Sequence, residues 1–212
     1  MKTDTTHETA VTQSVEAAGV RFAFRRIGAA TSPPIVFCHR FRGTMDDWDP
    51  TVINGLAKDR AVSILVNAGI GLFTGTTPTS VKGMAECAAH FIEALGLSQV
   101  DGWRYWDRLT LRTAEPVEPP VPVPSIQAQV AAIMTSTQGI DSAFSRLGEI
   151  KQPVLVVNGS NDVMIPTYNS FLMAQRIPKA QLIVYPDSGH GALLQYPEQL
   201  VRHGLDFLGQ AA

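Results

Sequence analysis

Hydrophobic residues occur along the chain in short continuous runs, and these runs alternate with stretches of helical periodicity. Apolar runs of four to eight residues between Gly, Pro or Asn are typical of strands buried on both faces of a sheet. The pattern predicts strands at 20–27, 34–39, 61–67, 100–102, 154–158 and 181–185. It predicts helices at 51–58, 80–95, 103–113, 125–135, 142–147, 167–176 and 197–208. The partial alternation within 20–27 favours an edge or half-exposed strand.

The order of these elements predicts the fold class. Strands alternate with helices at both ends of the chain, which is typical of a three-layer α/β fold with a mostly parallel sheet and helices on both faces. The middle is different, because five prolines lie between Glu115 and Pro124 and helices flank them. We therefore expect one structural domain in three parts: core at 1–102, a helical cap-like insertion at 103–150, and core again at 151–212.

Composition narrows the class of protein. Apolar residues make up 45% of the chain and charged residues 17%, which excludes a disordered chain. The net charge is −2 without charged blocks, so we expect neither a nucleic-acid partner nor an electrostatic membrane anchor. The polar N-terminus carries no visible signal peptide, the apolar runs are too short to cross a bilayer, and the two cysteines indicate a reducing compartment. We expect a cytoplasmic protein.

The sequence predicts no metal and no cofactor. Gly69-Ile70-Gly71 does not continue into the dinucleotide-binding pattern GxGxxG, because residue 74 is Thr. His7 and His203 are expected to be solvated and His90 to lie on a helix, and none has metal-ligand spacing to a partner.

Polar residues follow the predicted strands, where the carboxyl ends of parallel strands bind ligands in such folds. His39-Arg40-Phe41-Arg42-Gly43 follows the strand at 34–39. Asp162 follows the strand at 154–158, and His190 follows the next strand, 28 residues later. Adjacent strands would bring this Asp and His to one edge, where the acid can fix the imidazole tautomer and raise its basicity. The alternative is that Asp162 only caps its own turn.

Four segments of the chain resemble the α/β-hydrolase fold family, esterases and lactonases in particular: PIVFCHRFRGTMDDW, NAGIG with the helix after it, VLVVNGSNDVMIP and YPDSGHGALLQYPEQLVRHGLDFL. Together they cover roughly two thirds of the chain. The resemblance implies hydrolysis of small esters, lactones or related bonds without a cofactor. It implies that Asp162 is the triad acid and His190 the base, that Phe41 supplies an oxyanion-hole amide with Arg40 beside it at the substrate, and that 103–150 is a cap.

The sequence departs from this family at the nucleophile. No serine lies in the frame G-x-S-x-G, which places the attacking serine on a sharp strand-to-helix turn. The segment where that elbow belongs reads Gly102-Trp103-Arg104, and the chain then continues into cap-like sequence. We infer that the nucleophile, its helix and the next core strand are deleted, and Val66 and Phe73 replace an Asp and a small polar residue common in the family. These changes indicate a remodelled or engineered chain, or else a natural degenerate copy.

We therefore expect serine-hydrolase activity to be absent or vestigial; the alternative is a non-catalytic small-molecule binder or scaffold. With a strand missing, we expect 154–158 to pair beside 100–102, or the strand at 100–102 to be lost and the sheet shortened. Uncovered apolar surface and a free sheet edge predict a homodimer or larger species, with 103–150 as the segment able to exchange between protomers.

Overall fold

The computed structural model describes residues 5–30, 33–39, 41–104, 119–139 and 143–210. The chain divides into two compact units, residues 1–141 and 142–212, and each is described by itself. The boundary between them falls inside the segment predicted as a cap, and the three-part division of one domain stays a prediction. None of the described helices is both long and apolar enough to cross a membrane.

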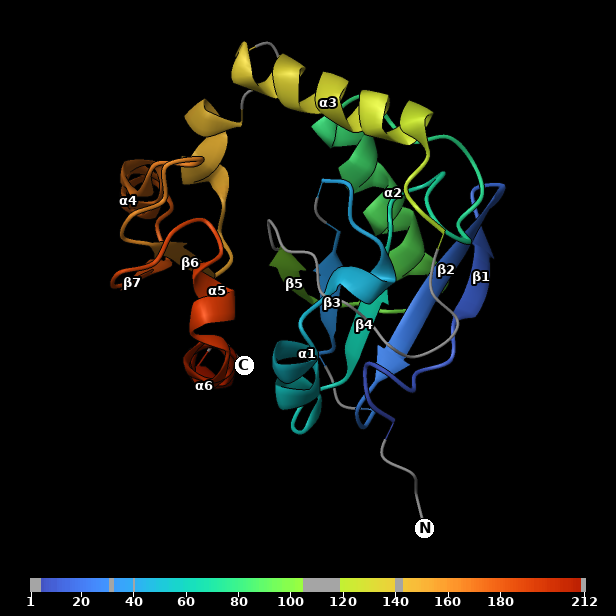
Figure 1. Ribbon diagram of the computed structural model, residues 1–212, viewed down its shortest axis with the longest axis horizontal. Helices are drawn as coiled ribbons and strands as arrows, with labels where there is room; N and C mark the ends of the chain where they lie inside the picture. The colour runs from blue at the N-terminus through green and yellow to red at the C-terminus, as the bar shows by residue number, and fades with distance from the viewer. Residues whose placement is uncertain (1–4, 31–32, 40, 105–118, 140–142, 211–212) are drawn as a thin grey trace. The chain divides into compact units, whose positions relative to one another are not determined.

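The first unit is built on a five-stranded sheet in the order β1-β2-β4-β3-β5 (Figure 1). Antiparallel pairing joins β1 (Gln13–Ala17) to β2 (Val20–Ile27) and β2 to β4 (Val62–Leu65). Parallel pairing joins β4 to β3 (Ile35–Cys38) and β3 to β5 (Asp101–Arg104). The predicted strand at 20–27 is therefore an interior strand, and β1 covers the edge that we expected it to form.

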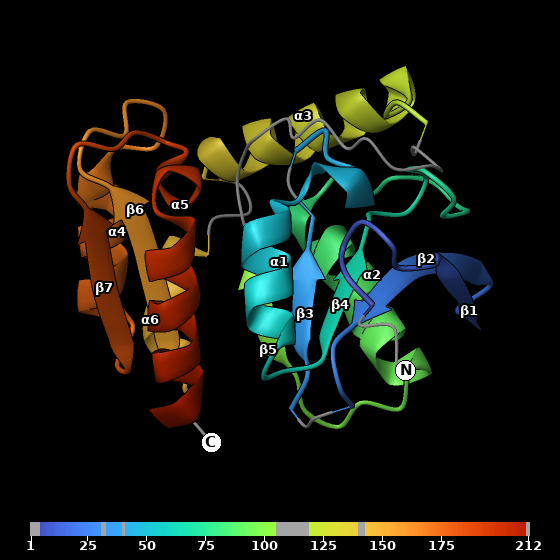
Figure 2. The same cartoon turned by 60° about the horizontal axis from the view of Figure 1, so that its bottom comes forward.

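Helices cover both faces of this sheet. Figure 2 shows α1 (Pro50–Ala57) and α2 (Val81–Ala94) on opposite faces. Their N-termini are capped by Asp49, which accepts a hydrogen bond from the Thr51 amide, and by Ser80, which accepts one from Gly83. A short 3₁₀ turn, η1 (Met45–Asp47), precedes α1, and α3 (Val123–Thr137) contacts α2. The core includes Phe22, Phe24, Phe73 and Phe91 in edge and tilted contacts.

Charged and polar side chains are also buried in this unit. Arg25 Nη1 lies 2.5 Å from Asp46 Oδ1, and the two side chains are 1% and 7% exposed. His7 is buried as well, with Nε2 at 3.0 Å from the Met45 carbonyl oxygen. The expectation that His7 is solvated is therefore wrong, because the N-terminal segment packs against η1 and α1 through hydrogen bonds that include His7 N–H to Asn54 Oδ1.

The second unit is smaller and also combines a β-sheet with helices. Two parallel strands, β6 (Val154–Gly159) and β7 (Ala180–Tyr185), form a separate sheet. Helix α4 (Thr167–Arg176) packs on both strands, and α6 (Pro197–Gln210) lies along the other side (Figure 2). A single helical turn, α5 (Ala192–Gln195), joins β7 to α6, and the 3₁₀ helix η2 (Phe144–Glu149) precedes β6.

Several predicted elements need correction. The strand at 154–158 does not pair beside 100–102, because β6 pairs with β7 in a sheet of its own while β5 persists beside β3. The helix predicted at 103–113 is wrong at its start, since residues 103 and 104 belong to β5, and the rest of it lies outside the described residues.

Candidate active site

The acid and the histidine expected at the strand ends meet in the second unit. His190 Nδ1 lies 2.8 Å from Asp162 Oδ2, and the two side chains are 12% and 2% exposed. Asp162 follows β6 and His190 follows β7, so parallel pairing of these strands brings the two loops to one edge of the sheet. The geometry thus supplies the expected hydrogen bond, and the catalytic roles of both residues stay predictions.

Asp162 is also the centre of its own turn. Its second carboxylate oxygen, Oδ1, accepts hydrogen bonds from the amides of Met164 and Ile165, each at 2.9 Å. One oxygen thus caps the turn while the other accepts from His190, so Asp162 does more than cap its own turn. A carboxylate serves both purposes, since its two oxygens accept in different directions.

The surroundings of Asp162 lower its pKa. Burial alone raises the pKa of this carboxyl, but the hydrogen bonds from the Ile165 amide, His190 and the Met164 amide outweigh burial and bring the pKa below its ordinary value. The carboxylate is therefore ionised at neutral pH and can only accept. His190 Nδ1 must carry the proton in this pair, which leaves Nε2 as the ring atom for proton transfer.

The turn that presents Asp162 is tied back to its own strand. Asn158 Nδ2 donates to the Ile165 carbonyl at 3.2 Å and to Ser170 Oγ at 3.1 Å. Thr167 Oγ1 donates to the Gly159 carbonyl at 2.5 Å. These bonds close the loop between β6 and α4, so Asp162 sits on a fixed turn.

The predicted oxyanion turn lies in the first unit, after β3. Phe41 is half-buried in a turn, its role as an amide donor stays a prediction, and Arg40 lies outside the described residues. His39 is structural here, because its ring contacts Trp48 and its Nε2 contacts the Thr44 carbonyl oxygen. This agrees with a turn in which the backbone, and not the histidine side chain, faces any ligand.

Gln129 contacts this turn, and the sequence did not predict it. It comes from α3, is 3% exposed, and its Oε1 accepts the Arg42 amide at 2.8 Å. Arg42 itself has a positive φ of 56°. The sequence around Gln129 predicts a helix, and nothing in it distinguishes Gln129 as a residue of the site.

The segment in which the sequence predicted the nucleophile elbow begins as a regular strand. Gly102, Trp103 and Arg104 lie in β5 and pair in parallel with Val36, Phe37 and Cys38 of β3. No serine is present in this strand, so the elbow expected after it is not formed by the residues described. Val66 and Phe73, the two apolar departures, are both buried in the core of this unit.

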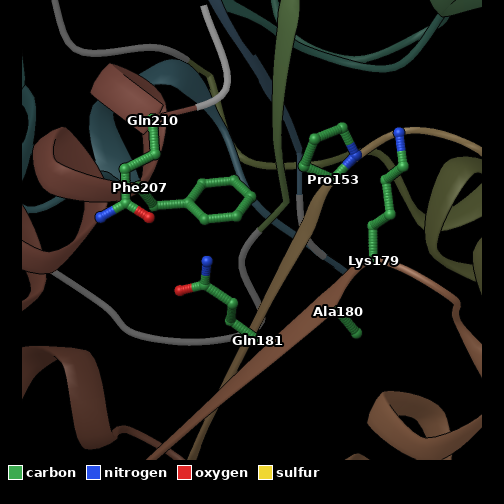
Figure 3. Close-up of a pocket in the computed structure, with 6 residues that line it drawn as sticks. All are labelled: Pro153, Lys179, Ala180, Gln181, Phe207 and Gln210. Carbon is green, nitrogen blue, oxygen red and sulfur yellow. The ribbon is translucent and has the colours of Figure 1, made fainter.

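Neither of two described cavities is lined by Asp162 or His190. One, of about 550 Å³, is bounded in the first unit by the loop 69–79 and the start of α3. The other, of about 320 Å³, lies in the second unit at the amino ends of β6 and β7, where Phe207 and Gln181 face it (Figure 3). That end is opposite the edge that carries Asp162 and His190. Among the residues described, no group of three His, Cys, Asp or Glu is arranged to hold a metal ion.

A match to a known family covers part of α3 and most of the second unit. Residues 130–197, which include Asp162 and His190, match the family model described as alpha/beta hydrolase fold. Two curated relatives are a pimeloyl-[acyl-carrier protein] methyl ester esterase from Nitrosomonas europaea, 36% identical over 84 residues, and a 2-hydroxymuconate semialdehyde hydrolase from Pseudomonas putida, 32% identical over 93 residues. These matches cover 40% and 42% of the chain but 31% and 33% of the relatives. The matched region thus spans about a third of those proteins.

Solved structures are similar over nearly the whole chain. An alpha/beta hydrolase fold protein from Chitinophaga pinensis is 29% identical, with a TM-score of 0.88, and the match covers 96% of this chain and 98% of that one. A serine hydrolase involved in carbazole degradation is 16% identical with a TM-score of 0.75, over 95% of this chain and 99% of that one. The second likeness is one of fold alone.

Proposed function

Because the chain belongs to the α/β-hydrolase fold family, we propose that it retains the acid and base of a hydrolase, Asp162 and His190, without a serine nucleophile. The observation that carries this proposal is the 2.8 Å hydrogen bond between the two side chains in a chain that has no G-x-S-x-G sequence. On this proposal hydrolytic activity is absent or vestigial.

The residual reaction would use water in place of serine. In the complete triad, serine attacks the carbonyl, the histidine takes its proton, and the acid stabilises the imidazolium. Here His190 Nε2 would take a proton from water as the water oxygen bonds to the carbonyl carbon. The proton would then pass to the leaving alcohol as the ester bond breaks. Removing the nucleophile costs several orders of magnitude, about 10⁶ in a serine protease, so slow turnover is the most that this pair supports.

The relatives suggest the class of substrate. One relative is an esterase for the methyl ester of a pimeloyl group on an acyl-carrier protein, and another is a semialdehyde hydrolase, so the named substrates of both contain a carbonyl group. We propose a small ester or a related carbonyl compound as the ligand of this chain.

The direct test of this proposal compares His190→Ala with His90→Ala, in which an exposed histidine of α2 is replaced. With p-nitrophenyl acetate as substrate, any hydrolysis above background should fall in His190→Ala and stay unchanged in His90→Ala. A fluorophosphonate probe should leave no adduct on the folded wild-type protein. Stoichiometric labelling of one serine would overturn the proposal.

A second candidate is a small-molecule binder with no catalysis, and the cavity of about 550 Å³ in the first unit favours it. Its walls come from the loop 69–79 and from Pro122–Ala131, and none of the lining residues is charged. This function gains support if p-nitrophenyl acetate and the fluorophosphonate leave the folded protein unchanged while p-nitrophenol or another neutral aromatic raises its melting temperature.

We also propose that the chain self-associates. The second unit exposes apolar side chains next to Asp162, namely Val163 at 90% exposure, Met164, Tyr168 and Phe171. Within the part of the chain that the structure describes, β6 and β7 each pair with one strand only, and an unpaired strand edge can pair with another chain. Sedimentation velocity should show a dimer or larger species at micromolar concentration. A monomer that persists to high micromolar concentration would contradict this.

A further inference from the structure

The loops that carry Asp162 and His190 come into backbone contact at Gly159. A methyl group built on this glycine would lie 2.3 Å from the carbonyl oxygens of Ser188 and Gly189, and 2.7 Å from the Ser188 carbonyl carbon. Side chains that obstruct a new methyl group can rotate away, but these three atoms belong to the backbone. Gly159 is therefore required by the close approach of the loop and not by an unusual φ angle.

Hydrogen bonds fasten the two loops at this contact. The Ser160 amide donates to the Tyr185 carbonyl at 2.9 Å, and the Asn161 amide donates to the Ser188 carbonyl at 2.8 Å. Ser188 is 1% exposed, and its Oγ donates to the Tyr185 carbonyl at 2.8 Å. The backbone that leads into Asp162 is thus bonded directly to the backbone that leads into His190.

We propose that Gly159 is a positioning residue for the Asp162–His190 pair, and that Ser188 holds the closed arrangement that the glycine permits. Gly159 lies three residues before Asp162, and the backbone that it contacts ends at the residue before His190. The absence of a side chain lets the second loop settle onto the first, so that the imidazole comes within hydrogen-bonding distance of the carboxylate.

The distances give the size of the effect. Ordinary van der Waals contact begins at 3.4 Å, so a methyl group now at 2.3 Å requires the loop to withdraw by 1.1 Å, the difference of the two. The same withdrawal added to the 2.8 Å bond between His190 and Asp162 gives 3.9 Å. A contact of that length is no longer a hydrogen bond. Alanine at this one position should therefore separate the pair while leaving both side chains in the protein.

The test observes the His190 Nδ1–H proton by NMR in the resting protein, with His190→Ala to assign its resonance. Gly159→Ala should lose this resonance or shift it upfield to the range of a solvated imidazole. Gly209→Ala is the matched control, because it lies in α6 of the same unit with no atom within 4 Å of the added methyl group. The control should leave the resonance unchanged. A Gly159→Ala protein that keeps the wild-type resonance would overturn the proposal.

Ser188→Ala provides a second variant in case Gly159→Ala does not fold. It removes one neutral hydrogen bond and adds no steric conflict, so exchange of the Nδ1–H proton should speed up about fivefold. Exchange at the wild-type rate in Ser188→Ala would count against the role of Ser188 and, with an unfolded Gly159→Ala, against the whole proposal. The consequence for turnover rests on the proposed function, whereas the NMR measurement does not, so the two can fail separately.

Discussion

Replacing Asp162 in two ways should separate its two structural roles. Asp162→Asn keeps a side-chain oxygen that can accept from the Met164 and Ile165 amides. It removes the negative charge, and with the oxygen on the turn it presents an NH₂ group to His190. Asp162→Ala removes both oxygens. The structure therefore predicts that the asparagine variant preserves the turn and disturbs His190, and that the alanine variant loses both.

The magnitudes follow from the bonds that each variant loses. Asp162 accepts three hydrogen bonds, two at 2.9 Å and one at 2.8 Å. A hydrogen bond to a charged group contributes about 1.5–3 kcal/mol and a neutral one about 1 kcal/mol. Because the turn amides can reach water once the acid is gone, we expect Asp162→Ala to lower the free energy of unfolding by about 3 kcal/mol. Asp162→Asn, which keeps two of the bonds in neutral form, should lower it by about 1–2 kcal/mol.

The measurement is urea unfolding followed by circular dichroism, with Asp206→Asn at an exposed position of α6 as a control. The two roles are separated if Asp162→Ala is at least 1 kcal/mol less stable than Asp162→Asn. Equal stabilities of the two variants would refute the turn-capping role of Oδ1. Wild-type stability in both variants would show that neither set of hydrogen bonds matters for folding.

Two further predictions concern charge. Asp46→Ala should lower the free energy of unfolding by about 3–5 kcal/mol, because it leaves the buried Arg25 guanidinium without this carboxylate. Glu149→Ala breaks an ion pair with Arg146 whose side chains are both more than half exposed, so it should lower the free energy of unfolding by less than about 1 kcal/mol. Urea unfolding of both variants checks these values. Since the pKa of Asp162 is lower in the folded protein than its ordinary value, the stability due to its charge is present above about pH 4 and is lost as the pH falls further. The difference in unfolding free energy between wild type and Asp162→Asn should accordingly shrink as the pH falls below about 4, and a constant difference in that range would contradict this.

The elements with clear periodicity could be predicted from the sequence. Helix α4 begins and ends at the predicted residues, and β6, β7 and α2 lie within about two residues of their predictions. Local patterns suffice here because each element has an apolar face or run bounded by residues that stop it. The approach of Asp162 and His190 was also predictable, since two parallel strands end at one edge.

Other features depend on packing between distant residues. Strand β1 has no apolar run and is mostly exposed, so it forms only because β2 offers an edge. The burial of Arg25 and His7 depends on Asp46 and Met45, which lie elsewhere in the chain. The formation of two sheets in place of one depends on which strands pair, and no local signal in the sequence reports the partner of a strand.

Stopped-flow hydrolysis of p-nitrophenyl acetate tests most directly whether an acid–base pair stands here without a nucleophile. The account predicts no burst of p-nitrophenol, and a slow steady rate that falls in His190→Ala and is the same in every single-serine variant. A burst equal in amount to the protein, and abolished by replacing one serine, would show that a nucleophile forms an acyl-enzyme and would contradict the central claim.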